Sequence, residues 1–193
     1  MLLSQFSLMD PKIAIAWIDL TLEIKSIFSA KKKVILNAVN GCAEFGSLTA
    51  VMGPSGAGLT SLLKSLNGMN NSLLSKDTRI RLSSDQKIRS TFVGHNEKEF
   101  LIMGLTAKQN MIYASKLKNS YCDQDFDHER NVHKIMAELL ISDTMNTEAE
   151  KCSGGEQKRL AIALELTAVD KPNLILCDEP TTGLDSNVAE MVS

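Results

Sequence analysis

Apolar and polar residues change their spacing along the chain, and the first third of the sequence predicts strands that lead into a helix. Residues 15–24 alternate between apolar and polar side chains, which is typical of a half-buried β-strand. A short strand, a turn near Asn40-Gly41 and a second strand over 48–52 follow. Leucines with helical spacing over 59–66 then predict a helix, which Gly68 ends.

The middle of the chain, about residues 96–150, has a different composition and pattern. It is richer in Met, Lys, Glu and Asn, and 106–118 and 129–140 have the apolar spacing of amphipathic helices. A Gly-Gly turn then opens an apolar helix near residue 154, and a buried strand that ends in two acidic residues follows it. Strand–loop–helix units on both sides of a helical insert predict an α/β fold, with a parallel sheet covered by helices.

Bulk composition narrows the class of protein. The 193 residues suffice for one domain, or for one and a part, and 44% of them are hydrophobic. The net charge is −2 and the basic run at 31–33 is short, which argues against a nucleic-acid partner, because phosphate backbones demand clustered positive charge. No apolar stretch approaches the roughly 20 residues that span a bilayer. The four cysteines are widely spaced without a CxxC pair, so reduced thiols of a cytosolic domain are expected.

The stretch "GPSGAGLT", residues 53–60, has the pattern of a phosphate-binding loop. It follows a predicted strand and opens a predicted helix, as such a loop requires. Glycines let backbone N–H groups approach phosphate oxygens, and the helix start adds the positive end of its dipole. Thr60 supplies a hydroxyl for Mg²⁺. A chance glycine-rich turn is the alternative for this motif alone.

Two further motifs strengthen that interpretation. The strand "LILCDEP" delivers Asp178, which can hold Mg²⁺, and Glu179, which is placed to polarise an attacking water. In "CSGGEQKRLAIA", Ser153 and the two glycines after it form a second helix start that suits an anion. An acidic pair that caps a strand and a simple helix cap are the alternatives. Two anion-binding helix starts in one domain favour a phosphate bound between two copies.

The three motifs occur in an order that resembles the nucleotide-binding domain of an ABC transporter, over about residues 15–190. The residues around them are similar to the G subfamily, the white-type half-transporters. The resemblance implies a P-loop NTPase (RecA-like) core over about 1–95 and 170–193, with a helical subdomain inserted over about 96–169. It also implies ATP and Mg²⁺ bound between two head-to-tail cassettes. A transmembrane domain is the other expected partner, with the cassette on the cytoplasmic face of the membrane.

By position, the resemblance assigns a role to each residue of the motifs. The nucleotide-binding loop comprises Gly53, Pro54, Ser55, Gly56, Ala57, Gly58, Leu59, Thr60 and Ser61. The signature, which contacts ATP held by the partner cassette, comprises Ser153, Gly154, Gly155 and Glu156. Thr60 and Asp178 are the expected Mg²⁺ ligands, Glu179 the catalytic base, and Asp185 the D-loop aspartate at the dimer interface.

Leu59 stands where the family has a lysine that reaches the β- and γ-phosphates. A charge-assisted hydrogen bond contributes about 1.5–3 kcal/mol, so ATP is expected to bind roughly ten- to a hundredfold more weakly. Hydrolysis should suffer more, because the same charge stabilises the transferring phosphoryl group.

Other positions also depart from the family. His95 lies about where the family has a glutamine and is a candidate catalytic residue, or a surface histidine in a loop. Ile24 is the residue nearest to the usual adenine-stacking aromatic, and Trp17 is expected in the core. No histidine follows His133, so a switch histidine and the last strands are missing, which predicts a C-terminally truncated cassette of low solubility.

The sequence is compatible with three functions. The first is the ATPase domain of a G-type transporter that exports lipids or xenobiotics. The second is a cassette that is degenerate at Leu59 and completes the partner's ATP site in a heterodimer; a non-functional fragment is a further alternative. The third is an ABC ATPase of DNA repair or translation, against which the single cassette and the slight acidity argue. The apolar run 100–103 is either a contact with the membrane domain or part of the core of the insert.

Overall fold

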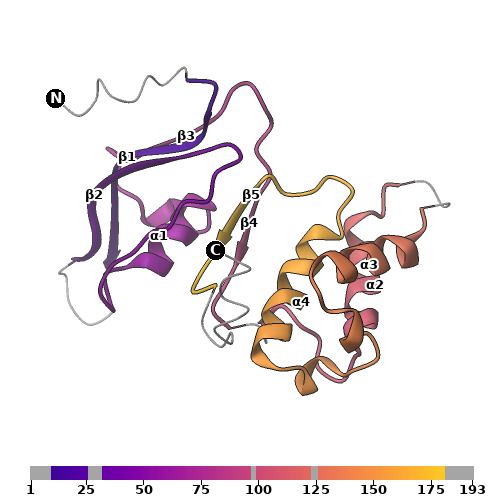
Figure 1. Cartoon of the computed structure of the whole chain (residues 1–193). Helices are drawn as coiled ribbons and strands as arrows, with labels where there is room; N and C mark the ends of the chain where they lie inside the picture. Colours follow the sequence, from indigo (N-terminus) through magenta and orange to yellow (C-terminus); the bar gives the residue numbers. More distant parts are fainter. Residues whose placement is uncertain (1–9, 26–31, 97–98, 123–125, 181–193) are drawn as a thin grey trace. The chain divides into compact units, whose positions relative to one another are not determined.

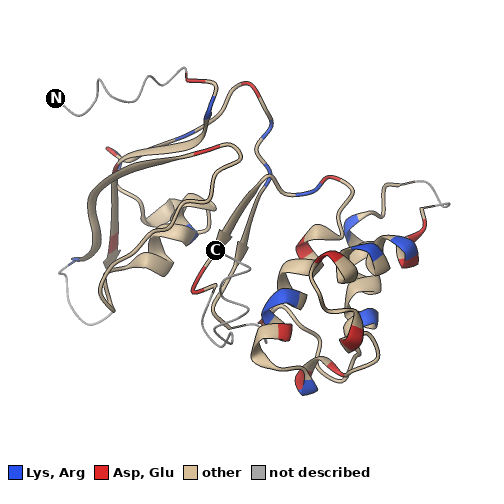
Figure 2. Cartoon of the chain, viewed as in Figure 1, with Lys and Arg blue, Asp and Glu red and all other residues tan. Residues whose placement is uncertain are grey.

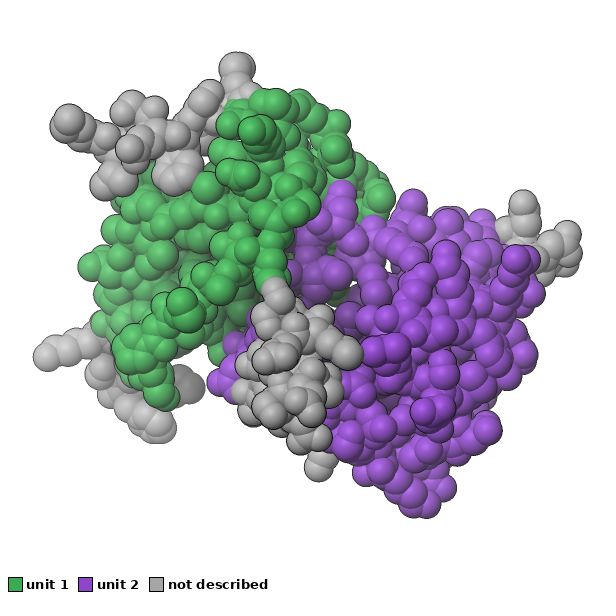
Figure 3. All heavy atoms as spheres, viewed as in Figure 1, with its two compact units in different colours: residues 1–92 green, residues 93–193 purple. Residues whose placement is uncertain are grey.

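The computed structural model describes residues 10–25, 32–96, 99–122 and 126–180, and the chain divides into two compact units. Unit 1 comprises residues 1–92 and unit 2 residues 93–193 (Figure 3). None of the helices within these described ranges is long and apolar enough to cross a bilayer.

Unit 1 contains an antiparallel sheet in the order β2-β1-β3 (Figure 1). β1 (Ile13–Lys25) pairs along most of its length with β2 (Lys32–Glu44) and at its start with β3 (Arg79–Leu82). The predicted first strand is therefore confirmed. The five residues 14–18 are all buried, so strict alternation of burial is seen only further along the strand.

The turn that we predicted near Asn40-Gly41 is wrong, because β2 continues through both residues. Gly41 pairs with Trp17 of β1, and a Cβ atom at Gly41 would lie 2.4 Å from the indole ring. The glycine is thus explained by the aromatic ring packed upon it and not by a turn. Pairing with β1 extends β2 across a dipeptide that in isolation favours a hairpin.

The predicted strand over 48–52 is also wrong, because these residues form no strand and are exposed in the structure. Leu48 and Met52 are 76% and 87% exposed. A strand requires a neighbour that supplies its backbone hydrogen bonds, and no strand in the described part of unit 1 pairs with 48–52. Apolar composition alone therefore did not suffice to make this segment a strand.

The helix predicted over 59–66 is confirmed as α1 (Leu59–Leu66). Its Leu62 and Leu66 are buried, and it packs against β2. Gly68 adopts a left-handed conformation with φ 80° and donates its N–H to the carbonyl of Ser65, which ends the helix as expected. A single turn of 3₁₀ helix, Asn71–Leu73, follows.

Unit 2 begins within β4 (Ser90–Val93), which pairs with β5 (Leu174–Cys177). Its other described elements are α2 (Ala107–Lys118), α3 (His128–Glu138), α4 (Gly154–Leu166) and two 3₁₀ turns, Ser142–Thr144 and Ala149–Lys151. The three helices pack on one another, as Figure 1 shows. Their shared core comprises Leu101, Ala107, Met111, Val132, Ile135, Met136, Ile141, Ala149, Leu160, Ala163 and Leu164.

A buried polar cluster joins the ends of the three helices. The amides of Asn119 and Asn131 both donate to the carbonyl of Thr167, at 2.9 Å each. Asn119 also accepts the N–H of Val169 at 2.7 Å. Asn119 is 3% exposed, so water does not reach its side-chain amide, and these hydrogen bonds satisfy the amide instead. The cluster fixes where the chain leaves α4 on its way to β5.

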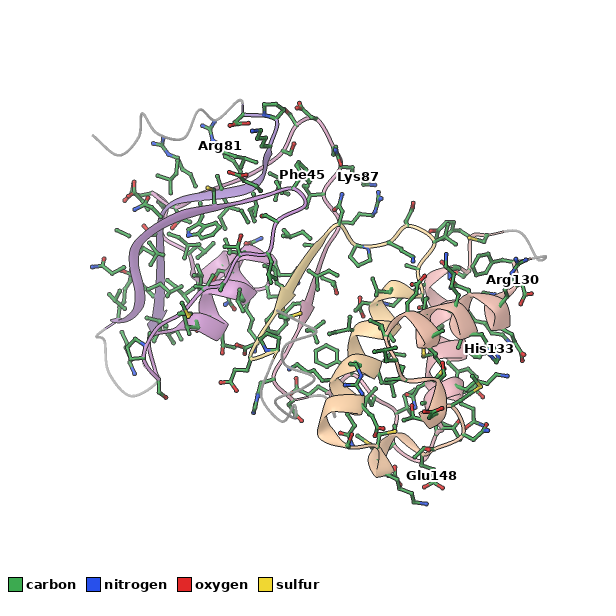
Figure 4. The ribbon with its side chains drawn as sticks, in the orientation of Figure 1. Phe45, Arg81, Lys87, Arg130, His133 and Glu148 are labelled. Carbon is green, nitrogen blue, oxygen red and sulfur yellow. The ribbon has the colours of Figure 1, made fainter. Side chains whose placement is uncertain are left out.

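Charges on the helical part of unit 2 are mixed. Figure 2 shows Lys and Arg interspersed with Asp and Glu along the three helices. Ion pairs join Lys108 to Glu129 and Lys118 to Glu165, at 3.2 and 2.7 Å. Arg130 and His133 both project from α3 away from the helical core (Figure 4).

Candidate functional site

The glycine-rich loop of unit 1 is shaped by its glycines. Gly56 and Gly58 have φ values of 81° and 90°, in the left-handed region that glycine adopts without strain. A Cβ at Gly58 would also lie 3.0 Å from the Leu36 side chain and 3.3 Å from Ile35, so β2 leaves no room for a larger residue. The N–H of Ala57 donates to the carbonyl of Pro54 at 3.0 Å and closes the loop.

The loop leads directly into the N-terminus of α1. No side chain caps this helix start, and its first turn contains no acidic residue. The first N–H groups of a helix and its dipole favour an anion at this end. The backbone of the loop and of α1 therefore keeps the form that a phosphate site requires.

Leu59 brings an apolar side chain to this loop. Its Cδ2 atom lies 3.6 Å from the position that a Cβ of Gly53 would occupy, so the leucine covers the start of the loop. No Lys or Arg occurs within 53–61. The loop therefore has a glycine-shaped backbone and no cationic side chain of its own.

In unit 2, the C-terminal ends of β4 and β5 lie together. The N–H of Asp178 donates to the carbonyl of Val93 at 2.9 Å, so the residues that follow the two strands are neighbours. Asp178 is 6% exposed, whereas more than half of the Glu179 side chain is exposed. One carboxylate is thus held in the protein and the next one faces outward.

His95 and Glu179 meet beyond these strand ends. The Nδ1 atom of His95 lies 3.0 Å from Oε2 of Glu179. Glu179 has a φ of 49°, which for a residue with a side chain costs on the order of 1–3 kcal/mol, and Asp19, Ala38 and Leu140 have similar values. His95 and Glu179 were predicted as candidate catalytic residues, and the structure brings them together.

The second helix start, at α4, has a capping box. Ser153 is the N-cap, and its Oγ accepts the N–H of Glu156 at 3.4 Å. The Ser153 N–H and hydroxyl both donate to Oε2 of Glu156, at 2.7 and 2.8 Å. Gly154 is exposed and Gly155 is buried, so the helix start itself faces outward. In this conformation the Glu156 carboxylate is the anion that the helix start holds.

Lys158 is a residue of this region that sequence analysis missed. It lies on α4, is 2% exposed, and its ammonium donates to the carbonyls of Gly94 and Asp178 at 3.0 Å each. Burial raises the pKa of the neighbouring Cys177 thiol, and the Lys158 charge partly opposes that rise. A signal was available, because Lys158 is three residues from both Gly155 and Ala161 on the buried face of the helix.

The predicted site residues lie in both units, and one of them lies outside the described residues. Residues 53–61 belong to unit 1, whereas His95, Asp178, Glu179 and 153–156 belong to unit 2. Asp185 lies outside the described residues. Ile24 is 43% exposed near the end of β1 and Trp17 is buried. The apolar run 100–103 is divided, since Leu101 is in the helical core while Ile102 is 56% exposed.

Fold and motifs together are those of the ATP-binding domain of ABC transporters. Residues 36–182 match the family described as ABC transporter, and the chain therefore belongs to that family. Its similarity to G-type, white-brown members, which we predicted, is confirmed by curated relatives. It is 33% identical over 190 residues to ABC transporter G family member 13 of Arabidopsis thaliana, covering 92% of this chain and 27% of the relative. It is 32% identical to the ATP-binding protein/permease wht-3 of Caenorhabditis elegans, covering 93% of this chain and 30% of the relative.

Solved structures support the P-loop NTPase fold. One neighbour is cbiO1 from Clostridium perfringens, part of the ABC transporter complex cbiONQ, with a TM-score of 0.70 and 18% identity. The match covers 94% of this chain and 71% of that chain. The chain spans less than a third of the length of the two curated relatives above.

Proposed function

We propose that this chain is the ATP-binding cassette of a G-type transporter, which couples ATP binding and hydrolysis to the export of lipids or xenobiotics. The cassette acts on the cytoplasmic face of a membrane, with a transmembrane domain and a second cassette as partners. The observation that carries the proposal is the end of β5, where buried Asp178 is followed by the outward-facing, strained Glu179 beside His95.

Each motif has a role in this proposal. The backbone N–H groups of 53–61 bind the phosphates, and Glu179 accepts the proton of the attacking water as general base. His95 orients the Glu179 carboxylate through their 3.0 Å contact. The Ser153 helix start contacts ATP held by the partner cassette once the Glu156 carboxylate moves aside.

Mg²⁺ is the metal ion that this proposal expects, and the side-chain chemistry of Thr60 and of Asp178 suits it. No cluster of three or more His, Cys, Asp or Glu in the described ranges could cage a metal. Mg²⁺ does not need such a cage, since it binds through one or two protein oxygen ligands together with substrate phosphates and water. The Asp178 carboxylate and the Thr60 hydroxyl are oxygen ligands of this kind. When bound, Mg²⁺ neutralises charge on the phosphate oxygens.

Leu59 favours a second candidate, a cassette whose own site is degenerate. The leucine covers the start of the loop, and no cation occurs within 53–61. The signature end of α4 keeps its helix start, so it can complete the partner's site. In a heterodimer the partner would then hydrolyse ATP, and this chain would supply the Ser153 helix end.

ATPase assays of the full-length transporter distinguish the two candidates. The proteins compared are the unchanged homodimer, Leu59→Lys, and Leu59→Lys combined with Glu179→Gln. A catalytic cassette hydrolyses ATP without substitution, whereas a degenerate one does so only after Leu59→Lys. In either case Glu179→Gln is expected to lower kcat by about 10²- to 10⁴-fold. Activity that survives Glu179→Gln contradicts the assigned general base.

A further inference from the structure

Lys158 carries a positive charge into the interior of unit 2. Among the described residues, it and Asp178 are the buried members of the charged class. A buried ammonium must have hydrogen-bond acceptors, because its hydration is lost on burial. Lys158 has two in the carbonyl oxygens of Gly94 and Asp178, at 3.0 Å each.

Both acceptors lie immediately before a candidate catalytic residue. Gly94 precedes His95, and Asp178 precedes Glu179. Because a peptide group is planar, the direction of a carbonyl fixes the direction of the N–H that follows it. The Lys158 ammonium therefore orients two peptide planes, the one between Gly94 and His95 and the one between Asp178 and Glu179. The side chains of His95 and Glu179 then meet at 3.0 Å.

We propose that Lys158 is a positioning residue for Glu179 and His95. This inference rests on the proposed function, in which Glu179 is the general base. The φ of 49° at Glu179 is unfavourable by itself and persists only where the surroundings hold it. The bond from Lys158 to the carbonyl of Asp178 is a constraint of this kind, because it acts on the peptide plane that defines that φ.

Lys158 lies on the same helix as the Ser153 helix start, and this connects the two. Ser153 caps the same helix, five residues earlier, which corresponds to about 7.5 Å along the axis. A helix of this length moves as one body, so a shift of its start on the partner's nucleotide also shifts the Lys158 ammonium. Lys158 thereby links the signature end of α4 to the catalytic carboxylate of the same chain.

Hydrogen exchange of the assembled full-length transporter, without nucleotide, tests the inference. Lys158→Met keeps the length of the side chain and removes its donors. We expect amide exchange in 93–96 and 176–180 to rise by about tenfold or more, with 107–118 unchanged. The matched control is Lys118→Met, which removes the 2.7 Å pair with Glu165 at the other end of α4. This control is expected to leave exchange in 93–96 and 176–180 as it was.

Unchanged exchange in those two segments, in a folded Lys158→Met protein, overturns the inference. Loss of protection across 107–118 would show that this variant does not fold, and Lys158→Gln then decides in its place. The shorter amide cannot reach both carbonyls, so the same local rise is expected, and its absence again overturns the inference.

A kinetic readout separates positioning from a structural role. In the Leu59→Lys background, Lys158→Met is expected to lower kcat by about ten- to a hundredfold with KM for ATP unchanged. A rise in KM with constant kcat contradicts the assignment. Failure of the Leu59→Lys protein itself to hydrolyse ATP would count against the proposed function, whereas the exchange experiment still decides on Lys158.

Discussion

The Nδ1 atom of His95 lies 3.0 Å from Oε2 of Glu179, and more than half of each side chain is exposed to solvent. An exposed polar contact contributes little to stability, about 0–1 kcal/mol even between charged groups. Under the proposed function, the His95 contact orients the Glu179 carboxylate and adds little to the fold. The residues come from the ends of two neighbouring strands, where ligand-binding residues of α/β proteins commonly gather.

Replacing His95 by glutamine should separate these two contributions. His95→Gln is expected to change the free energy of unfolding by less than about 0.5 kcal/mol, because the pair is exposed. Its effect on kcat in the Leu59→Lys background measures how far the imidazole orients Glu179. Thermal unfolding and steady-state ATPase assays check the two parts. A large loss of stability would contradict the interpretation of the pair as functional.

Leu59→Lys is expected to strengthen ATP binding at the cassette's own loop. The lysine restores a charge-assisted hydrogen bond of about 1.5–3 kcal/mol, so Kd should fall roughly ten- to a hundredfold. Titration calorimetry of the full-length protein with Mg·ATP measures this change. Leu59→Met serves as the control, since it restores length without charge. Equal affinities of the lysine and methionine variants would show that the missing charge is not what weakens the site.

One serine and one threonine cap two different helices in the same way, so their substitutions can be compared directly. Ser153 and Thr106 both head a capping box, in α4 and α2 respectively. Replacing either by alanine should cost about 1 kcal/mol of stability. Only Ser153→Ala should also lower the ATPase activity of the dimer, because only that helix start is assigned to the partner's nucleotide. Equal ATPase losses in the two variants would contradict the signature assignment.

Gly41→Ala tests the packing of β1 on β2. The added Cβ would lie 2.4 Å from the Trp17 ring, so the ring or the strands must shift, at a cost of about 1–3 kcal/mol. Urea unfolding measures the loss. Combining Gly41→Ala with Trp17→Phe removes the ring atoms that the Cβ meets, and the added cost of Gly41→Ala should then largely disappear. Strict additivity of the two substitutions would show that the contact is not the cause.

Asn119→Ala tests the polar cluster that ends α4. The substitution leaves the N–H of Val169 and part of the Thr167 carbonyl without their partner, which should destabilise unit 2 by about 2 kcal/mol or more. Asn146→Ala, at an exposed position, is the control and should change stability by less than about 0.5 kcal/mol. Similar effects of the two substitutions in urea unfolding would contradict a structural role for the cluster.

Local chemistry explains which elements were predictable from the sequence. The start of α4 follows from Ser153 and Glu156, and the end of α1 from Gly68, because caps and left-handed glycines act on neighbouring residues. Gly41 and the segment 48–52 could not be predicted correctly in the same way. Their conformations depend on a strand or a ring that is distant in sequence.

In the candidate site, too, some features follow from local sequence and others depend on distant contacts. Asp178 and Glu179 follow an apolar strand and could be recognised from that pattern. The left-handed backbone at Glu179 and the bonds of Lys158 to two strand ends depend on tertiary contacts, so no local pattern contained them. The Glu156 carboxylate on the signature helix start is a third such feature, visible only once the capping geometry is known.

Gly58 has room for no side chain between the loop and β2, and its φ of 90° suits glycine alone. The curvature of the loop at Gly58 thus fits the strand beneath it, which leaves no space for a Cβ. Under the proposed function, Leu59 changes the charge of the loop and leaves its backbone conformation as it is. Leu59→Lys is therefore expected to restore the charge without any rearrangement of the loop.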